Sequence, residues 1–300
     1  MKPRTLLILC ACTVSVAARA GDKTVQVTEP APTLPWSLRL DTAWVGKGDF
    51  DKGGDGSVFE SRIQIAVQRP VGLPLLGGTD PRWVLRMGLE WNRYGFDHSA
   101  GAPGFLPGTL QSTSALIALE YRTTAGLGAL FEARPGLFYE HDATLNSFDI
   151  PLKAAAVWQL GDRFALVAGA TYSGMRKSPV IPVGGFWWKI SDSLVLNAVP
   201  PDPRFEYLLN ENALLWLGGE VAGGAYRTDA GRTGRLNAAV VDYTDYRAST
   251  GVQWKVTRDW SLEAGAGVSL YRKFDFQRAE VGVKTDDVAP FVRFSLRGEW

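Results

Sequence analysis

The chain ends on the stretch VRFSLRGEW, residues 292–300. Its side chains alternate between apolar residues or glycine and polar or charged residues. Successive side chains of a β-strand point to opposite sides, so a period of two is typical of a strand with one apolar and one polar face. The stretch therefore predicts a strand that separates a nonpolar environment from a polar one.

The same alternation recurs along most of the chain. It is clear in ten segments, at residues 36–44, 59–67, 83–92, 117–122, 127–134, 150–160, 164–173, 246–256, 260–270 and 292–300. Residues 186–199 and 213–226 show it less cleanly, and Pro200, Pro201 and Pro203 cut off the first of these two. Together the segments predict an all-β fold of about 12 strands, with a range of about 10–14.

Residues 1–20 have the features of a secretory signal peptide. Basic residues open the segment, residues 6–17 are apolar, and Ala18-Arg19-Ala20 is a small-residue cleavage site. A lipoprotein acylated at Cys12 would leave only residues 6–11 as the apolar region, which is too short, and an uncleaved anchor needs about 20 apolar residues. Residues 21–35, with three prolines, predict an extended lead-in, and residues 36–300 predict one domain.

Charge and cysteine content exclude several classes of protein. Three of the 32 basic residues and none of the 31 acidic residues precede residue 21, so the mature chain has 29 basic and 31 acidic residues. This balance argues against a nucleic-acid partner, whose phosphates need neutralisation. Both cysteines, Cys10 and Cys12, lie in the signal peptide, so we expect no disulfide and no cysteine-ligated metal in the mature chain. The sequence predicts no cofactor.

The aromatic residues, 11 Trp, 9 Tyr and 14 Phe, need an apolar environment in an exported chain. A helical membrane span is excluded because no later segment holds about 18 uninterrupted apolar residues. A transmembrane antiparallel up-and-down β-barrel would instead place the apolar strand faces in lipid, with short periplasmic turns and longer outer loops. The connections follow this rule except at residues 70–81 and 200–212, which are long where periplasmic turns are expected. A secreted β-sandwich, with its apolar faces buried, is the alternative fold.

The C-terminal stretch resembles the assembly signal of bacterial outer-membrane β-barrel proteins, which Phe294, Leu296 and Trp300 would carry here. Gly298 is a departure, since those signals usually have a larger apolar residue at this place. The mature chain with its signal peptide looks like a member of an uncharacterised family of such barrels, to which residues 186–220 are similar. The resemblance implies the outer membrane of a Gram-negative bacterium, with membrane lipids, lipopolysaccharide and the barrel-assembly machinery as partners. It implies no catalytic residues and indicates no oligomeric state.

Charged residues on the polar strand faces are expected to line the lumen. In a water-filled lumen their two signs would set a transverse field, whereas in a closed barrel they would fill the interior as ion pairs. The candidates are Arg39, Arg62, Arg86, Glu90, Glu120, Arg122, Glu132, Arg134, Lys153, Glu263, Arg293 and Arg297. The pattern predicts a porin-like passive channel for small hydrophilic solutes. A structural or surface-recognition barrel is an alternative, and about 12 strands leaves both an open and a plugged lumen possible.

Enzyme chemistry has little support in the sequence. The commonest local signatures of enzymes are absent, so no catalytic residue is predicted. His98 and His141 lie beside acids in predicted outer loops, which keeps an outer-membrane hydrolase as a further alternative. Solvated loop histidines are the more ordinary interpretation.

One loop resembles a calcium-binding loop in its spacing. Counted from Asp49, the positions one, three, six and twelve hold Asp49, Asp51, Gly54 and Glu60, with Asp55 as a further carboxylate. Carboxylates bind this hard cation and glycine permits the sharp turn. These four acids are therefore a candidate metal site, and a flexible acidic surface loop is the alternative.

Overall fold

The computed structural model describes residues 36–71, 83–122, 126–277 and 279–300. The predicted signal peptide and lead-in, residues 1–35, lie outside this part, as does most of the long connection at residues 70–81, so these remain predictions.

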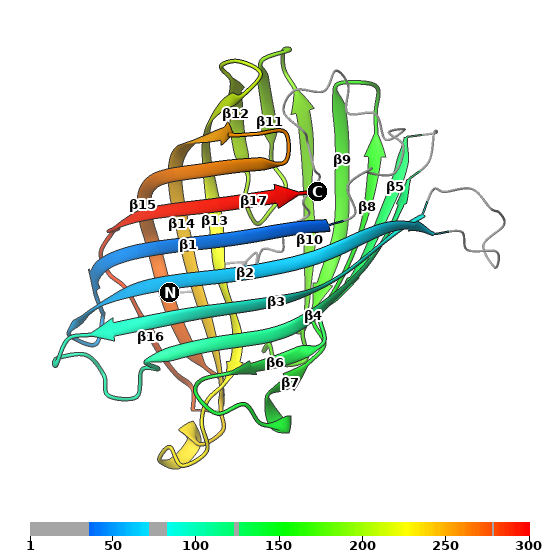
Figure 1. Cartoon of the computed structure of the whole chain (residues 1–300). Helices are drawn as coiled ribbons and strands as arrows, with labels where there is room; N and C mark the ends of the chain where they lie inside the picture. The colour runs from blue at the N-terminus through cyan, green and yellow to red at the C-terminus, as the bar shows by residue number, and fades with distance from the viewer. Residues whose placement is uncertain (1–35, 72–82, 123–125, 278) are drawn as a thin grey trace, which may run out of the picture.

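Fourteen strands pair side by side, each antiparallel to the next, and the last pairs with the first (Figure 1). In order around the wall they are β1 (Trp36–Asp49), β2 (Asp55–Val71), β3 (Trp83–His98), β4 (Thr109–Arg122), β5 (Leu127–Ala133), β8 (Leu152–Gln159), β9 (Phe164–Tyr172), β10 (Val180–Lys189), β11 (Leu194–Asn197), β12 (Arg204–Leu208), β13 (Ala213–Arg227), β14 (Val240–Lys255), β15 (Trp260–Phe276) and β17 (Ala289–Glu299). The molecule is therefore a closed all-β barrel.

Among the described residues, three further strands and two short helices lie at one end of the barrel. They are β6 (Gly136–Tyr139), β7 (Phe148–Asp149) and β16 (Val281–Lys284), with the 3-10 helices η2 (Leu145–Ser147) and η3 (Gly234–Leu236). We call this the outer end, because it carries the connections predicted to be outer loops. No helix in the described part of the chain is long and apolar enough to cross a membrane.

The seam between β1 and β17 closes the barrel. Nine residue pairs join them, from Ser37 opposite Glu299 to Val45 opposite Phe291. Trp36 and Trp300 exchange two backbone hydrogen bonds, with N···O distances of 3.0 and 3.1 Å. The other edge of β17 pairs with β15. The C-terminal stretch is thus held on both sides.

The glycine at position 298 has a steric cause. The Trp260 ring lies over Gly298 and stacks on Trp300 with ring centroids 5.9 Å apart. A Cβ atom at position 298 would meet the Trp260 ring at 2.8 Å. The departure from the usual assembly signal therefore makes room for a tryptophan of the neighbouring strand.

The apolar side chains of the alternating segments point away from the lumen. The most exposed of them is Leu89, at 62%. Other exposed apolar side chains of these segments are Trp44, Phe59, Phe131, Leu166, Leu217, Leu262 and Phe294. A β-sandwich would bury these side chains between two sheets. The single closed sheet shows that the alternative fold is wrong.

The strand number is 14, so the prediction of about twelve is wrong by two. The predicted segment at residues 186–199 covers the end of β10 and all of β11, and β12 was not predicted, so three strands were counted as one around the short hairpin β11–β12. Its strands have four and five residues, which is too few for a period of two to stand out. The prolines at 200, 201 and 203 lie in the tip of this hairpin, so they do not belong to a long periplasmic connection. The true connection to β13 is the short turn at residues 209–212.

At the outer end of the barrel, strand β4 pairs with a different strand than it does at the inner end. The inner half of β4 pairs with β5 and its outer half pairs with β6, with Pro135 at the break. Strand β6 then reaches β13, where Tyr139 lies opposite Arg227 and the Glu140 N–H donates to the Arg227 carbonyl at 3.0 Å. The wall is therefore drawn together at this end, and strands β8 to β10 lie outside the narrower ring.

Deleting residues 294–300 should prevent closure. The truncated chain loses most of the β1–β17 register, and the backbone groups of β1 that it leaves unpaired cost several kcal/mol each in lipid. We expect no folded, protease-resistant protein in the membrane fraction, whereas Trp300→Phe keeps the aromatic ring and should accumulate normally. Wild-type levels of the truncated protein in that fraction would contradict this account of the seam.

Candidate functional site: the barrel lumen

The outer end of the lumen is filled by aromatic side chains. We call this group the aromatic cap: Phe50, Tyr94, Phe96, Tyr226, Tyr243, Phe274, Phe276 and Phe291, all buried. Several rings meet edge to face, with centroids 5.0 Å apart for Phe96 and Phe274 and 5.1 Å for Phe96 and Tyr243. Such contacts add to the free energy gained from burying the rings. The cap was not predicted, because at these strand ends the alternation is reversed: aromatic side chains point inward and the residues between them, such as Asp97, Asp242 and Asp275, are polar.

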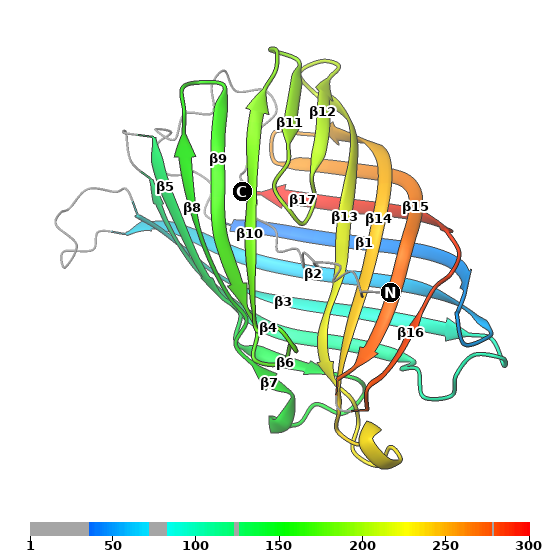
Figure 2. The ribbon, with the colours of Figure 1, turned by 180° about the vertical axis from the view of Figure 1, so that it is seen from behind.

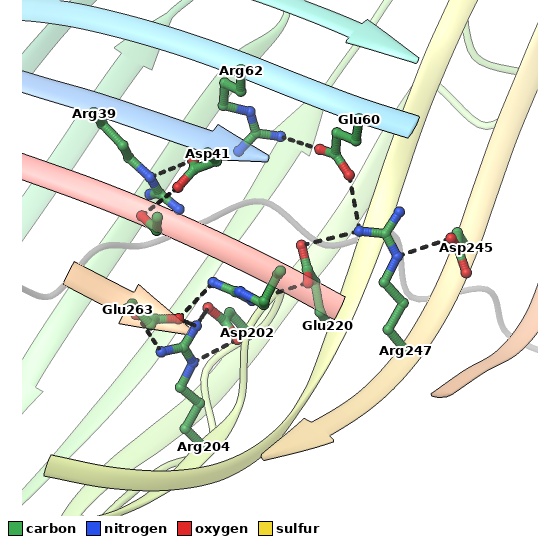
Figure 3. A network of polar contacts seen from close by, with 12 residues as sticks. Arg39, Asp41, Glu60, Arg62, Asp202, Arg204, Glu220, Asp245, Arg247 and Glu263 are labelled. Carbon is green, nitrogen blue, oxygen red and sulfur yellow. Dashed lines mark hydrogen bonds and ion pairs between the residues drawn. The ribbon is translucent and has the colours of Figure 1, made fainter. Parts of the chain in front are cut away.

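A dense group of ion pairs crosses the lumen next to the cap (Figure 3). We call it the ionic layer: Arg39, Asp41, Glu60, Arg62, Asp202, Arg204, Glu220, Asp245, Arg247, Glu263, Arg293 and Arg297. Arginines and carboxylates are equal in number. The layer therefore neutralises itself, which is the condition for burying charges without a large penalty.

Glu263 and Arg247 are the two centres of this layer. Glu263 accepts from three arginines, Arg204 at 3.0 Å, Arg293 at 2.9 Å and Arg297 at 3.3 Å. The Arg247 guanidinium is 2.9 Å from both Asp245 and Glu60 and 3.8 Å from Glu220. These contacts join strands on different sides of the barrel and tie the walls together.

Trp216 supports the layer from the wall of β13. The Arg204 guanidinium lies 4.3 Å from the centroid of its ring and that of Arg293 lies 5.3 Å away. A Cβ atom at Gly251 or Gly265 would meet the indole at 2.6 Å. Glycines on β14 and β15 thus leave the space in which one indole lies beneath two cations.

The structure places the predicted lumen residues in three groups. Arg39, Arg62, Glu263, Arg293 and Arg297 belong to the ionic layer. A second cluster joins Arg134 to Glu90 at 2.9 Å and to Glu132 at 2.7 Å, with Arg86 3.7 Å from Glu132 and Lys153 opposite Glu132 in the strand register. Glu120 is partly buried at the inner end of β4, and Arg122 is the last residue of that strand.

Several charged residues of the layer were not predicted. Arg247 lies on the polar face of an alternating segment, so the same pattern could have identified it. Asp202 and Arg204 come from the short hairpin, where no pattern is visible, and Glu220 lies in a glycine-rich strand.

The calcium-like loop is not assembled. Glu60 points into the lumen, where it pairs with Arg247 and Arg62. Asp55 pairs with Lys47 at 3.3 Å, and Asp51 accepts from the Lys284 backbone N–H at 3.2 Å. The prediction assumed that residues 49–60 form one loop. Strand β2 begins at Asp55, and the pleat of this strand directs the Glu60 side chain away from the acids of the loop.

The two histidines lie in different surroundings. His98 packs among Phe50, Phe96 and Phe274 of the aromatic cap, and its Nε2 is 3.0 Å from the Pro107 carbonyl. His141 Nδ1 lies 2.9 Å from Asp229 at the outer rim. Within the described ranges, no hydrogen bond joins either imidazole to a hydroxyl group that could serve as a nucleophile.

Glu140, His141 and Asp229 bring three possible metal-ligand atoms within 4.8 Å of one another. Arg232 already binds both carboxylate oxygens of Glu140, and the Asp229 N–H donates to the same carboxylate at 3.1 Å. This cluster is therefore an ion-pair network that joins two outer loops.

Asp229 accepts hydrogen bonds from its loop neighbours, and these bonds shift its pKa. Burial raises its pKa, but hydrogen bonds from the Asp142 and His141 N–H groups and from the His141 ring outweigh burial and lower the pKa below its ordinary value. The charged form of Asp229 is thus the form that docks the loop at residues 140–147.

No family model matches the chain, and no curated protein matches it. Solved structures with a similar chain path include the COG4313 outer membrane channel from Pseudomonas putida F1, with 15% identity, a TM-score of 0.49, and 91% of this chain and 100% of that chain covered. The Pseudomonas putida toluene transporter TodX has 12% identity and a TM-score of 0.38, over 94% and 97% of the two chains. Outer membrane phospholipase A from Escherichia coli has 11% identity and a TM-score of 0.36, over 91% and 95%. At these values the likenesses assign no activity, and the resemblance to an uncharacterised family stays a prediction.

Replacing Glu263 should destabilise the barrel strongly. Glu263→Ala leaves three arginines facing one another in a buried site, and breaking a buried pair in this way typically costs about 3–5 kcal/mol. Urea unfolding in lipid vesicles measures the loss. Asp192→Ala, which removes an exposed partner of Lys189, is the control and should change the midpoint little. Equal midpoints for the two variants would contradict a structural role of the layer.

Acid should release the loop that Asp229 holds. Since the folded-state pKa lies below that of the unfolded chain, the contact stabilises the loop above the unfolded value and is lost as the pH falls through the folded value. Amide hydrogen exchange at His141 and Asp142, corrected for the intrinsic rate, should rise at a pH below the ordinary aspartate pKa of about 3.9. In Asp229→Asn the protection should be weak at neutral pH as well. Protection that is unchanged in this variant would show that the carboxylate does not hold the loop.

Proposed function

We propose that the chain is an integral β-barrel of the bacterial outer membrane and a passive route for small solutes, with a lumen held closed by the ionic layer. The observation that carries this proposal is a closed sheet with apolar side chains on its outside and charges of both signs on its inside. Only a closed barrel satisfies the backbone of a strand-built wall in lipid.

The outer surface supports the membrane location. Tryptophans are exposed near the ends of several strands, as expected of side chains at a lipid–water interface. They are Trp36, Trp44, Trp158, Trp188, Trp254 and Trp300. The predicted signal peptide and C-terminal assembly signal agree with export and insertion into the outer membrane.

The lumen supports a gated route. A hydrophilic solute that crosses the ionic layer has to separate ion pairs such as Arg247–Glu60, and it can replace their lost contacts with its own polar groups. Because the layer is balanced in charge, it has no net charge with which to favour ions of one sign. The closed state is therefore the resting state in this proposal, and small hydrophilic solutes pass when the pairs open.

No second function has an observation in its favour among the described residues. A hydrolase would need an activated nucleophile beside a histidine, and His98 is packed among aromatic rings while His141 is engaged by Asp229.

Planar-bilayer recording tests the proposal. The purified wild-type protein should give small and infrequent conductance steps, because the ionic layer is closed for most of the time. Removing both partners of one central pair, in Glu60→Gln with Arg247→Met, keeps the charge balance and should give larger or longer steps.

The matched control removes an exposed pair outside the layer, in Lys189→Ala with Asp192→Ala, and should behave as the wild type does. Bilayers that show no conductance with either the wild type or the Glu60/Arg247 variant would count against a route through the lumen.

A further inference from the structure

Strand β10 has one edge that is only partly paired. Its first edge pairs with β9 from Val180 to Trp188. On the second edge, β11 pairs only with residues 187–189, and the last contact is the Ala198 N–H donating to the Phe186 carbonyl at 2.8 Å. From residue 180 to 185 this edge has no strand partner among the residues that the structure describes.

The edge of β13 that faces β10 is also only partly paired. Strand β12 pairs with residues 214–218, and the hairpin tip adds two contacts, Gly219 N–H to Pro203 and Val221 N–H to Pro201. The next strand partner on this edge is Tyr139 of β6, at Arg227. We call the region between the two edges and the hairpin tip, bounded by residues 180–185, 198–203 and 221–224, the wall gap. It ends toward the outer end of the barrel, where Met175 packs against Ala225. Figure 2 shows the tip ending partway along the wall while β10 and β13 continue on either side.

The sequence is adapted to an unpaired edge here. In a strand, residues of the same parity direct their backbone groups to the same edge, so Pro182 directs its nitrogen to the same side as Phe186, toward the wall gap. Proline has no N–H and is tolerated in a strand at such an edge. Across the gap, the Gly223 N–H donates to the hydroxyl of Tyr94, a residue of β3 on the opposite side of the lumen, at 3.2 Å. The β10 edge thus has no N–H group at Pro182, and the N–H group of Gly223 on the β13 edge has a hydrogen-bond acceptor. Both features lower the free-energy cost of leaving these edges unpaired in an apolar medium.

The lining of the wall gap is apolar on both sides. Val180, Pro182 and Gly184 are exposed on its outer face. Its inner face has the buried side chains Ile181, Val183, Val199 and Ala222. Two members of the aromatic cap, Tyr94 and Tyr226, adjoin it from inside. The neighbouring charges, Asp202 and Glu220, are paired with Arg204 and Arg293.

We propose that the wall gap is a lateral portal through which small uncharged apolar molecules pass between the aromatic cap and the acyl chains of the membrane. Such a molecule has no polar groups with which to replace the ion pairs of the ionic layer, so that layer bars it from the inner half of the lumen. The gap offers a path lined mainly by apolar side chains, and the one acid on its border, Asp202, is paired with Arg204. This inference rests on the membrane location in the proposed function and is independent of conductance through the ionic layer.

The first test asks whether the gap is open. The mature chain has no cysteine, and a side chain at Gly184 meets nothing closer than 3.7 Å. Cysteines at Gly184 and Ala168, which lie opposite each other on paired strands, should form a disulfide on oxidation. Cysteines at Gly184 and Val221, on either side of the gap, should form none. A disulfide in the second pair as readily as in the first would show a sealed wall and overturn the proposal.

The second test asks whether apolar molecules pass. The probe is N-phenyl-1-naphthylamine, an uncharged apolar fluorophore, added to cells that make the wild-type protein and to cells without it. Entry should be faster with the protein. Bridging the Gly184→Cys/Val221→Cys pair with a bismaleimide of sufficient length should reduce entry to the rate without the protein. Bridging Gly184→Cys/Ala168→Cys should leave entry unchanged.

The outcomes separate the two proposals. Conductance steps without faster probe entry would leave the proposed function in place and overturn the portal, as expected if a lipid acyl chain simply fills the gap. Probe entry that persists after bridging would also overturn it. Failure of every reagent to bridge two thiols that each react singly would place another part of the chain between the strands, and that result too would reject the portal.

Discussion

The backbone pairing of β1 with β17 is the interaction on which the rest of this molecule depends. A sheet with polar backbone groups along a free edge is not stable in lipid, and closure removes both edges at once. Closure also determines which face of each strand meets the surroundings, so the alternation along the sequence becomes an apolar outside and a polar inside. The glycine at 298 and the stacked rings of Trp260 and Trp300 are local consequences of making this seam fit.

A closed wall encloses a volume that side chains must fill, and the two halves are filled by different chemistry. Aromatic rings occupy the outer end, where hydrophobic burial needs no partners. In the ionic layer, the balance of arginines and carboxylates allows charges to lie together out of water. The same closure explains the wall gap, because a hairpin of two very short strands, β11 and β12, spans only part of the height that β10 and β13 span beside it.

The parts of the fold that were predictable are those where a single strand carries the signal. Strands such as β3 and β14 are long and have one charged face, so their alternation is visible in isolation. The hairpin β11–β12 is too short for this, and the strand count was therefore too low. Arg39 and Glu263 were predicted as lumen residues from alternation alone, but their partners were not. Ion pairs in a barrel join residues far apart in the chain, as Glu60 and Arg247 are, 187 positions from each other. The calcium-like loop was predicted from spacing along the chain. In the structure its twelfth position, Glu60, lies on β2 and its side chain points into the lumen, away from the loop.

The central claim is a closed barrel in a membrane, and electrophoretic mobility in detergent tests it most directly. Protein extracted from the outer membrane and run without boiling should migrate as a compact band, which boiling converts to the slower band of the unfolded chain. Identical mobility before and after boiling, together with recovery of the protein in the soluble periplasmic fraction, would contradict the account.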